Sequence, residues 1–146
     1  MAAAAAQGAS AEVGVVTRLL KAPDTGPDDI LAADGYIFAT PENLAAISGM
    51  MKDFFDRCYY PCLERLNGRP YTAMVCAGSD GSNAVRQIAR IATGWRLRDV
   101  AAPLIICTHA QTPEAILATK TITPIDLVAC RSLGAAFAAG LAMGIY

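Results

Sequence analysis

Four apolar runs with strand-like composition alternate with helix-like segments along this chain of 146 residues. The runs cover residues 13–20, 35–39, 71–77 and 98–107, and helical patterns occupy much of the sequence between and after them. Alternation of this kind is typical of a parallel sheet that is covered by helices on both faces. We therefore predict a three-layer α/β fold that forms one domain over residues 1–146.

The predicted helices differ in how clearly their apolar faces repeat. The clearest pattern begins at Leu44, where apolar residues recur at three- and four-residue steps: Leu44, Ile47, Met50, Met51, Phe54 and Phe55. Further helices are expected over residues 28–33, 83–93 and 124–141, with a helix-prone stretch at 2–11 and one helical turn at 113–117. Pro103 predicts an edge position for the last strand, because proline cannot donate a hydrogen bond to a neighbouring strand.

Composition excludes several classes of function. The formal net charge is −1, with 12 basic and 13 acidic residues, and no basic stripe indicates nucleic-acid binding. Five cysteines without a framework spacing are typical of reduced thiols, which predicts a cytoplasmic protein without a metal site. The N-terminus is a poor signal peptide, and the apolar stretch 133–146 is short for a membrane span, so no membrane partner is expected.

Two polar elbows, at residues 40–43 and 78–83, each follow a predicted strand. Because ligands of parallel α/β sheets bind beyond the carboxyl ends of the strands, both elbows are candidates for a binding site. A loop rich in Gly, Ser and Asn offers backbone N–H groups at low steric cost, which suits the carbonyls and ring nitrogens of a heterocycle. The same residues also serve ordinary turns, so composition alone leaves both interpretations open.

Two longer stretches carry a resemblance to a known family. "ADGYIFATPEN", followed by "SGMMKDFFDR", closely resembles a segment of the flavodoxin-like superfamily, in particular of its NAD(P)H-dependent FMN oxidoreductase branch. "CAGSDGSNAVRQIARIATGWRL" resembles the next strand and loop of the same family, and the resemblance extends from about residue 13 to the C-terminus. It implies a flavodoxin-like fold with FMN as cofactor and NAD(P)H as co-substrate.

The resemblance also implies which residues meet the flavin. The first elbow would lie against the flavin ring and ribityl chain, with the following helix start near the ring: Thr40, Pro41, Glu42, Asn43, Ser48 and Gly49. The second loop would approach the other edge of the ring: Ala77, Gly78, Ser79, Asp80, Gly81 and Asn83. The implied activity is reduction of quinones or similar small acceptors. A flavodoxin-type electron carrier and a flavin-free, self-associating scaffold are the alternatives, and homo-oligomer formation is left open.

One part of the family pattern is not recognised in this sequence. The family begins with an apolar strand and a loop that holds the FMN phosphate at a helix N-terminus, whereas only twelve residues precede the first predicted strand here. In the strand order 2-1-3-4-5, the missing strand would lie between residues 13–20 and 35–39. Three explanations are compatible with this: a start too far downstream, a shortened fold with weak or no flavin binding, or a partner chain that fills the gap.

Other candidate residues carry weaker signals. His109, the only histidine, is expected to be a solvated loop residue rather than a catalytic one, and no catalytic residue is assigned. Tyr59 and Tyr60 are expected in the core or at a subunit interface, with a lid over the flavin as the alternative. Arg86 and Arg90 would share one helix face, either simply solvated or facing an NADPH phosphate.

Overall fold

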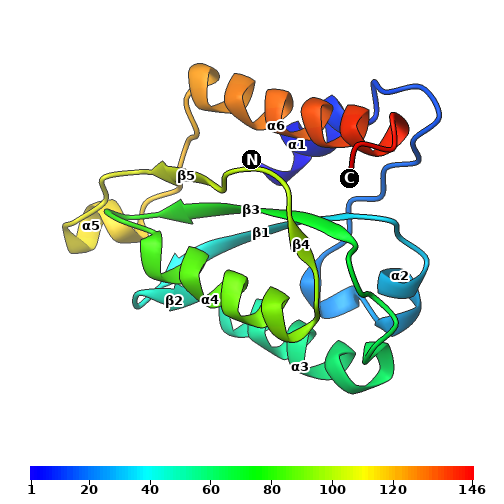
Figure 1. Ribbon diagram of the computed structural model, residues 1–146. Coiled ribbons are helices and arrows are strands. Elements are labelled where there is room, and N and C mark those ends of the chain that lie inside the picture. Colours follow the sequence, from blue (N-terminus) through cyan, green and yellow to red (C-terminus); the bar gives the residue numbers. More distant parts are fainter.

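The computed structural model describes all 146 residues and confirms the α/β layering (Figure 1). Helices and strands alternate along most of the chain, as the sequence predicts. The elements are α1 (Ala2–Ala9), the 3-10 helix η1 (Ala22–Asp24), α2 (Pro27–Leu31), β1 (Tyr36–Asn43), β2 (Ala46–Ile47), α3 (Gly49–Cys62), β3 (Pro70–Ala77), α4 (Ser82–Gly94), β4 (Arg98–Asp99), β5 (Leu104–Cys107), α5 (Pro113–Leu117) and α6 (Pro124–Ala142).

The sheet is parallel except for one short hairpin. Its order is β2-β1-β3-β4, and β5 also pairs with β3. β1 and β3 run parallel from the pair Tyr36–Tyr71 to the pair Pro41–Cys76, while β2 is antiparallel to the end of β1. β3 is the central strand and is almost continuously apolar, as expected for a strand that is covered on both faces. Because the parallel strands share one direction, β1, β3 and β5 all end at the same edge.

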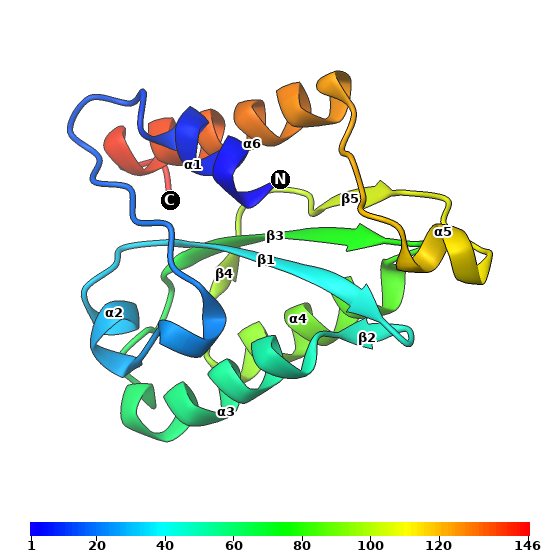
Figure 2. The ribbon, with the colours of Figure 1, turned by 180° about the vertical axis from the view of Figure 1, so that it is seen from behind.

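Two layers of helices cover the sheet, as Figures 1 and 2 show. α3 and α4 lie on one face and bury an aromatic cluster, whereas α1 and α6 lie side by side on the other face. Phe38 of β1 is central to the cluster, since its ring lies 5.1 Å from that of Phe55 and 6.3 Å from that of Trp95, both edge-on. Aromatic pairs with this geometry are typical of well-packed cores.

α1 and α6 approach each other closely enough to require glycine. A Cβ atom on Gly134 would lie 1.9 Å from the carbonyl oxygen of Ala5, and one on Gly8 would lie 2.0 Å from that of Arg131. α6 itself has the length and apolar composition of a membrane-crossing helix, although only 28% of the residues in its apolar 18-residue stretch are buried. Core helices of soluble proteins can also pass this test, so the absence of a membrane partner stays a prediction.

The structure corrects several predicted element boundaries. Residues 13–20 form no strand, and the strand predicted over 98–107 is split into β4 and β5 by a segment that contains Pro103. The sequence also predicts that Tyr59-Tyr60-Pro61 ends the helix that follows β1, but α3 continues through Pro61 to Cys62, and Cys58 and Cys62 are both buried in it. Burial raises the pKa of the Cys58 thiol to about 11, and this thiol is therefore neutral near pH 7.

The helix after β1 also begins later than predicted. α3 starts at Gly49, and Leu44 lies in a turn with its side chain fully exposed rather than on a buried helix face. Met50 is also exposed, whereas Met51, Phe54 and Phe55 are buried as expected. The extra segment between β1 and α3 is used for the short hairpin with β2, which reverses the chain before the helix begins.

Candidate functional site

The two predicted elbows lie together at the carboxyl edge of the sheet. A Glu42 carboxylate oxygen accepts a hydrogen bond from the backbone N–H of Gly81 at 3.1 Å. The side-chain amide of Asn83 donates to the carbonyl oxygen of Ala45, and Gln87 accepts from the N–H of Ile47 at 2.9 Å. Three side chains therefore join the hairpin of β1 and β2 to the second loop and α4, and they fix the relative position of these segments.

The first elbow is not the simple strand-to-helix turn that the sequence suggests. β1 runs through Thr40, Pro41, Glu42 and Asn43, and the chain then turns into β2. Ser48 is the N-cap of α3, and its hydroxyl accepts from the N–H of Met51 at 3.3 Å. The buried Thr40 hydroxyl accepts from the N–H of Ser48 at 3.2 Å, which holds the base of the hairpin to the start of the helix.

The turn of this hairpin has unusual backbone angles for its residues. Leu44 and Ala45 both have positive φ angles, of 51° and 59°. A two-residue hairpin turn with two positive φ angles normally carries Asn-Gly or Asp-Gly, because these residues tolerate the left-handed region. The Leu-Ala pair is therefore strained, and it lies directly beside the second loop through the contact of Asn83 with Ala45.

The second loop presents unused hydrogen-bond donors. The backbone N–H groups of Gly78, Ser79 and Asp80 donate no hydrogen bond within the protein, and the side chains of Ser79 and Asp80 are exposed. The loop is supported from behind by β5, because the N–H of Thr108 donates to the carbonyl oxygen of Ala77 at 2.8 Å. Three free donors on a supported loop can bind the acceptors of a flat heterocycle.

Gly81 completes this loop as the N-cap of α4. Its φ of 77° lies in the left-handed region. A Cβ atom there would lie 2.7 Å from Cγ2 of Ile105, 3.1 Å from Cβ of Ala77 and 3.3 Å from Cγ1 of Val75. Both the backbone angle and the packing therefore require glycine at the point where Glu42 holds the loop.

The remaining candidates lie outside the paired loops. His109 is exposed and lines a cavity of about 230 Å³ together with Lys120 and Asp126. His109 directly follows Thr108, whose N–H group donates to Ala77 at the start of the second loop. Arg86 and Arg90 share an exposed face of α4, and Arg86 donates to the side-chain oxygen of Asn83 at 3.3 Å.

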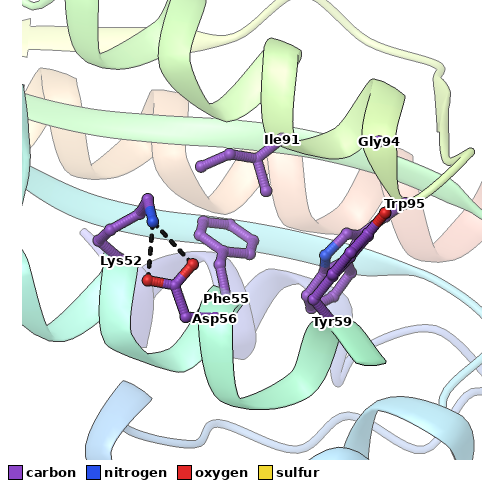
Figure 3. A pocket seen from close by; sticks show the side chains of 7 residues that line it. All are labelled: Lys52, Phe55, Asp56, Tyr59, Ile91, Gly94 and Trp95. Carbon is purple, nitrogen blue, oxygen red and sulfur yellow. Dashed lines mark hydrogen bonds and ion pairs between the residues drawn. The ribbon is translucent and has the colours of Figure 1, made fainter. Parts of the chain in front are cut away.

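A second hollow, of about 200 Å³, lies between α3 and α4 (Figure 3). Its lining includes Tyr59, Trp95 and the ion pair of Lys52 with Asp56. Tyr59 follows the N-cap of α3 by eleven residues, which is about 16 Å along a helix. Tyr59 is thus far from the paired loops, and the structure does not place it over the predicted flavin site.

Comparison with solved structures supports the fold assignment. A flavodoxin from the domain Archaea superposes with a TM-score of 0.69 at 17% identity, covering 94% of this chain and 85% of that one. A flavodoxin, WrbA-like protein from Agrobacterium tumefaciens gives 0.64 at 20% identity, covering 94% and 84%. An NADPH-quinone reductase from P. pentosaceus gives 0.58 at 15% identity, covering 91% and 88%. The fold is therefore flavodoxin-like.

The sequence itself identifies the family. The family described as NADPH-dependent FMN reductase matches residues 26–112, which include both loops. The chain belongs to this family, with FMN as the cofactor and NADPH as the reductant. No curated protein matches the sequence. The predicted family, fold and cofactor are thus confirmed, whereas the contribution of each site residue stays a prediction.

Sequence reasoning did not find every residue that shapes the site. Gln87 of α4 accepts a hydrogen bond from Ile47 of β2 and so joins the hairpin to α4, and neither residue was among the site candidates. The spacing of 40 residues between them gives no local signal, because the contact depends on how α4 packs beside the hairpin. For the same reason, the sequence suggested Glu42 as a flavin contact, although the structure uses its carboxylate to hold Gly81.

Proposed function

We propose that this chain binds the FMN ring between residues 40–43 and 78–83 and uses NADPH to reduce quinones or similar small acceptors. The observation that carries this proposal is the set of free N–H groups at Gly78, Ser79 and Asp80. They lie on a loop that is already fixed to the first elbow, so the loop loses little conformational entropy when a ligand binds. Bound FMN would supply the redox chemistry between NADPH and the acceptor.

The residues of this chain would act mainly by shaping the site. Glu42 holds the two loops at a fixed separation through Gly81, and Thr40 fixes the hairpin to Ser48. In this arrangement the side chain of Glu42 is a positioning group rather than a flavin ligand, and flavin contacts from the first elbow would come from its backbone. Arg86 and Arg90 are the candidate contacts for a phosphate of NADPH, since both are exposed on α4, the helix that begins at the second loop.

The net charge of −1 favours an enzyme over a flavodoxin-type electron carrier. A carrier that docks on redox partners uses a strong field of one sign to steer association, and such a field needs a large net charge. A flavin-free scaffold would have no use for three free backbone donors at a supported loop. We further expect a cytoplasmic protein whose partners are small molecules rather than nucleic acid or membrane.

Turnover with defined substrates tests this function. With FMN bound, we expect continuous oxidation of NADPH when a soluble quinone is added. The reaction is monitored by the loss of NADPH absorbance. The matched control is the same reaction without quinone, which measures the slow transfer to oxygen. Flavin that is bound but exchanges electrons only with a separate reductase would contradict the enzyme and support the carrier. Absence of bound flavin would support the scaffold.

A further inference from the structure

Trp95 carries the one buried side-chain polar atom of this protein that has no hydrogen-bond partner. Its indole nitrogen, Nε1, is enclosed, and no group of the chain accepts from it. The residue as a whole is only 5% exposed. Folded proteins rarely leave a buried N–H group without an acceptor, because the group has lost its bonds to water. The unused donor therefore indicates an acceptor from outside the chain.

The core holds the indole ring without satisfying its donor. The ring centroids of Phe38, Phe54 and Phe55 lie 6.3, 5.9 and 5.3 Å from that of Trp95. None of these three side chains has an oxygen or nitrogen atom. An aromatic face accepts an N–H group only weakly, so these contacts fix the position of the indole but do not replace an oxygen acceptor.

The indole also forms part of the wall of the hollow between α3 and α4. In Figure 3 its nitrogen lies on the side of the ring that faces Phe55, which is another wall of the hollow. Ile91 adds an apolar wall, and a Cβ atom on Gly94 would have no neighbour within 4 Å. The volume is about 200 Å³. Because an apolar cavity of about 150 Å³ can hold benzene, this hollow has room for one aromatic ring with a small substituent.

The charges at the mouth of the hollow favour a neutral ligand. The ammonium group of Lys52 donates to both carboxylate oxygens of Asp56 at 2.7 Å, so the two charges offset each other. Both side chains are exposed. An anion would be repelled by Asp56 and would have to displace it from Lys52, whereas a neutral molecule leaves the pair intact.

An acceptor reaches the buried nitrogen only when one wall of the hollow moves. Tyr59 is the wall best placed to do so, since it is half-buried and its ring lies 5.0 Å from that of Tyr60. Tyr60 is itself 78% exposed. Tyr59 is therefore packed on that side by an exposed ring, and rotation toward solvent breaks few core contacts.

We propose that the hollow between α3 and α4 binds a neutral, single-ring aromatic molecule whose carbonyl oxygen accepts a hydrogen bond from Nε1 of Trp95. The ligand ring would pack against Phe55 and Ile91, and Tyr59 would move outward to admit it. The site is separate from the paired loops, because Tyr59 lies about 16 Å along α3 from the N-cap of that helix. This inference does not depend on flavin binding.

Trp95 is the only tryptophan of the chain, so the isotope-labelled protein gives a single indole N–H resonance in NMR spectra. We expect acetophenone to shift this resonance downfield until one molecule is bound per chain. The matched ligand is α-methylstyrene, which has a CH₂ group in place of the carbonyl oxygen. It should bind at least tenfold more weakly and cause no downfield shift, because it cannot accept the hydrogen bond.

A pair of neighbouring substitutions locates the site. Gly94→Leu should weaken acetophenone binding at least tenfold, since the added side chain would fill the hollow. Thr93→Leu is the matched control, because Thr93 is exposed on α4 and does not line the hollow, and it should bind acetophenone like the wild type. Circular dichroism establishes that both variants are folded.

Four results would overturn the proposal. The first is an indole resonance that does not respond to acetophenone up to its solubility limit, which would leave the aromatic rings of the core as the only neighbours of the donor. The second is an equal response to α-methylstyrene. The third is acetophenone binding that Gly94→Leu leaves unchanged. The fourth is tighter binding of benzoate than of acetophenone, which would exclude a neutral ligand as the preferred class.

Discussion

Replacing Gly81 with alanine is expected to lower the free energy of unfolding by about 2–5 kcal/mol and to weaken FMN binding at least tenfold. The left-handed backbone at Gly81 alone costs roughly 1–2 kcal/mol for a residue with a Cβ atom. Overpacking adds roughly 1–3 kcal/mol, because the new methyl group would meet Ile105, Ala77 and Val75 at the core side of the loop. Relief must come from a shift of the loop or of these side chains, and a shift of the loop would disturb the bond of Gly81 with Glu42.

Chemical denaturation and flavin fluorescence measure the two effects of Gly81→Ala separately. The matched control is Gly94→Ala at the other end of α4, where a Cβ atom would have no neighbour within 4 Å. We expect the control to match or exceed the wild-type stability and to bind FMN normally, since alanine favours the helix. A Gly81→Ala protein that is destabilised but binds FMN as tightly as the wild type would remove this loop from the site.

Substitution in the turn of the β1–β2 hairpin is expected to stabilise the protein, because Leu44 and Ala45 are residues that the backbone geometry of the turn disfavours. Leu44→Asn together with Ala45→Gly should stabilise the protein by about 1–2 kcal/mol, since both positive φ angles would then be occupied by residues that tolerate them. Leu44 is fully exposed, so its removal loses no packing. Thermal unfolding should show a midpoint that is higher by several degrees, about 2–4 °C for each kcal/mol at this size.

One of the other Leu-Ala dipeptides of the chain, at residues 117–118, provides the control for the turn. Leu117 and Ala118 are also exposed, but neither has a positive φ. Leu117→Asn with Ala118→Gly should therefore leave the midpoint unchanged or lower it slightly, because the backbone strain is absent there. Equal effects at the two sites would show that the turn at residues 44–45 is not strained.

Periodicity and propensity predicted the elements whose packing is decided locally. β3 and α4 appear within a residue or two of the predicted bounds, because their apolar residues face the core at regular spacing. The strand predicted over residues 13–20 was wrong for a different reason. Strand propensity describes how a segment fits a sheet, and it does not supply the neighbour that a strand needs. β1 has an open edge, but the ends of this segment are held on opposite faces of the sheet.

The site was predicted as two loops but not as a connected unit. The order of strands and elbows indicated that both loops would meet at one edge, and the structure places them there. The hairpin was missed because Leu44-Ala45 has none of the chemistry that normally indicates a tight turn. The bonds of Glu42 with Gly81 and of Gln87 with Ile47 join residues about forty positions apart, and only the packed fold brings them together.

Titration of the chain with FMN, followed by quenching of flavin fluorescence, tests the central claim most directly. We expect quenching to saturate at one FMN per chain with a dissociation constant on the order of micromolar or tighter, about −8 kcal/mol. Such a result would establish that the loops at residues 40–43 and 78–83 are sufficient to form a flavin site. Unquenched fluorescence at FMN concentrations far above the protein concentration would contradict the proposed site.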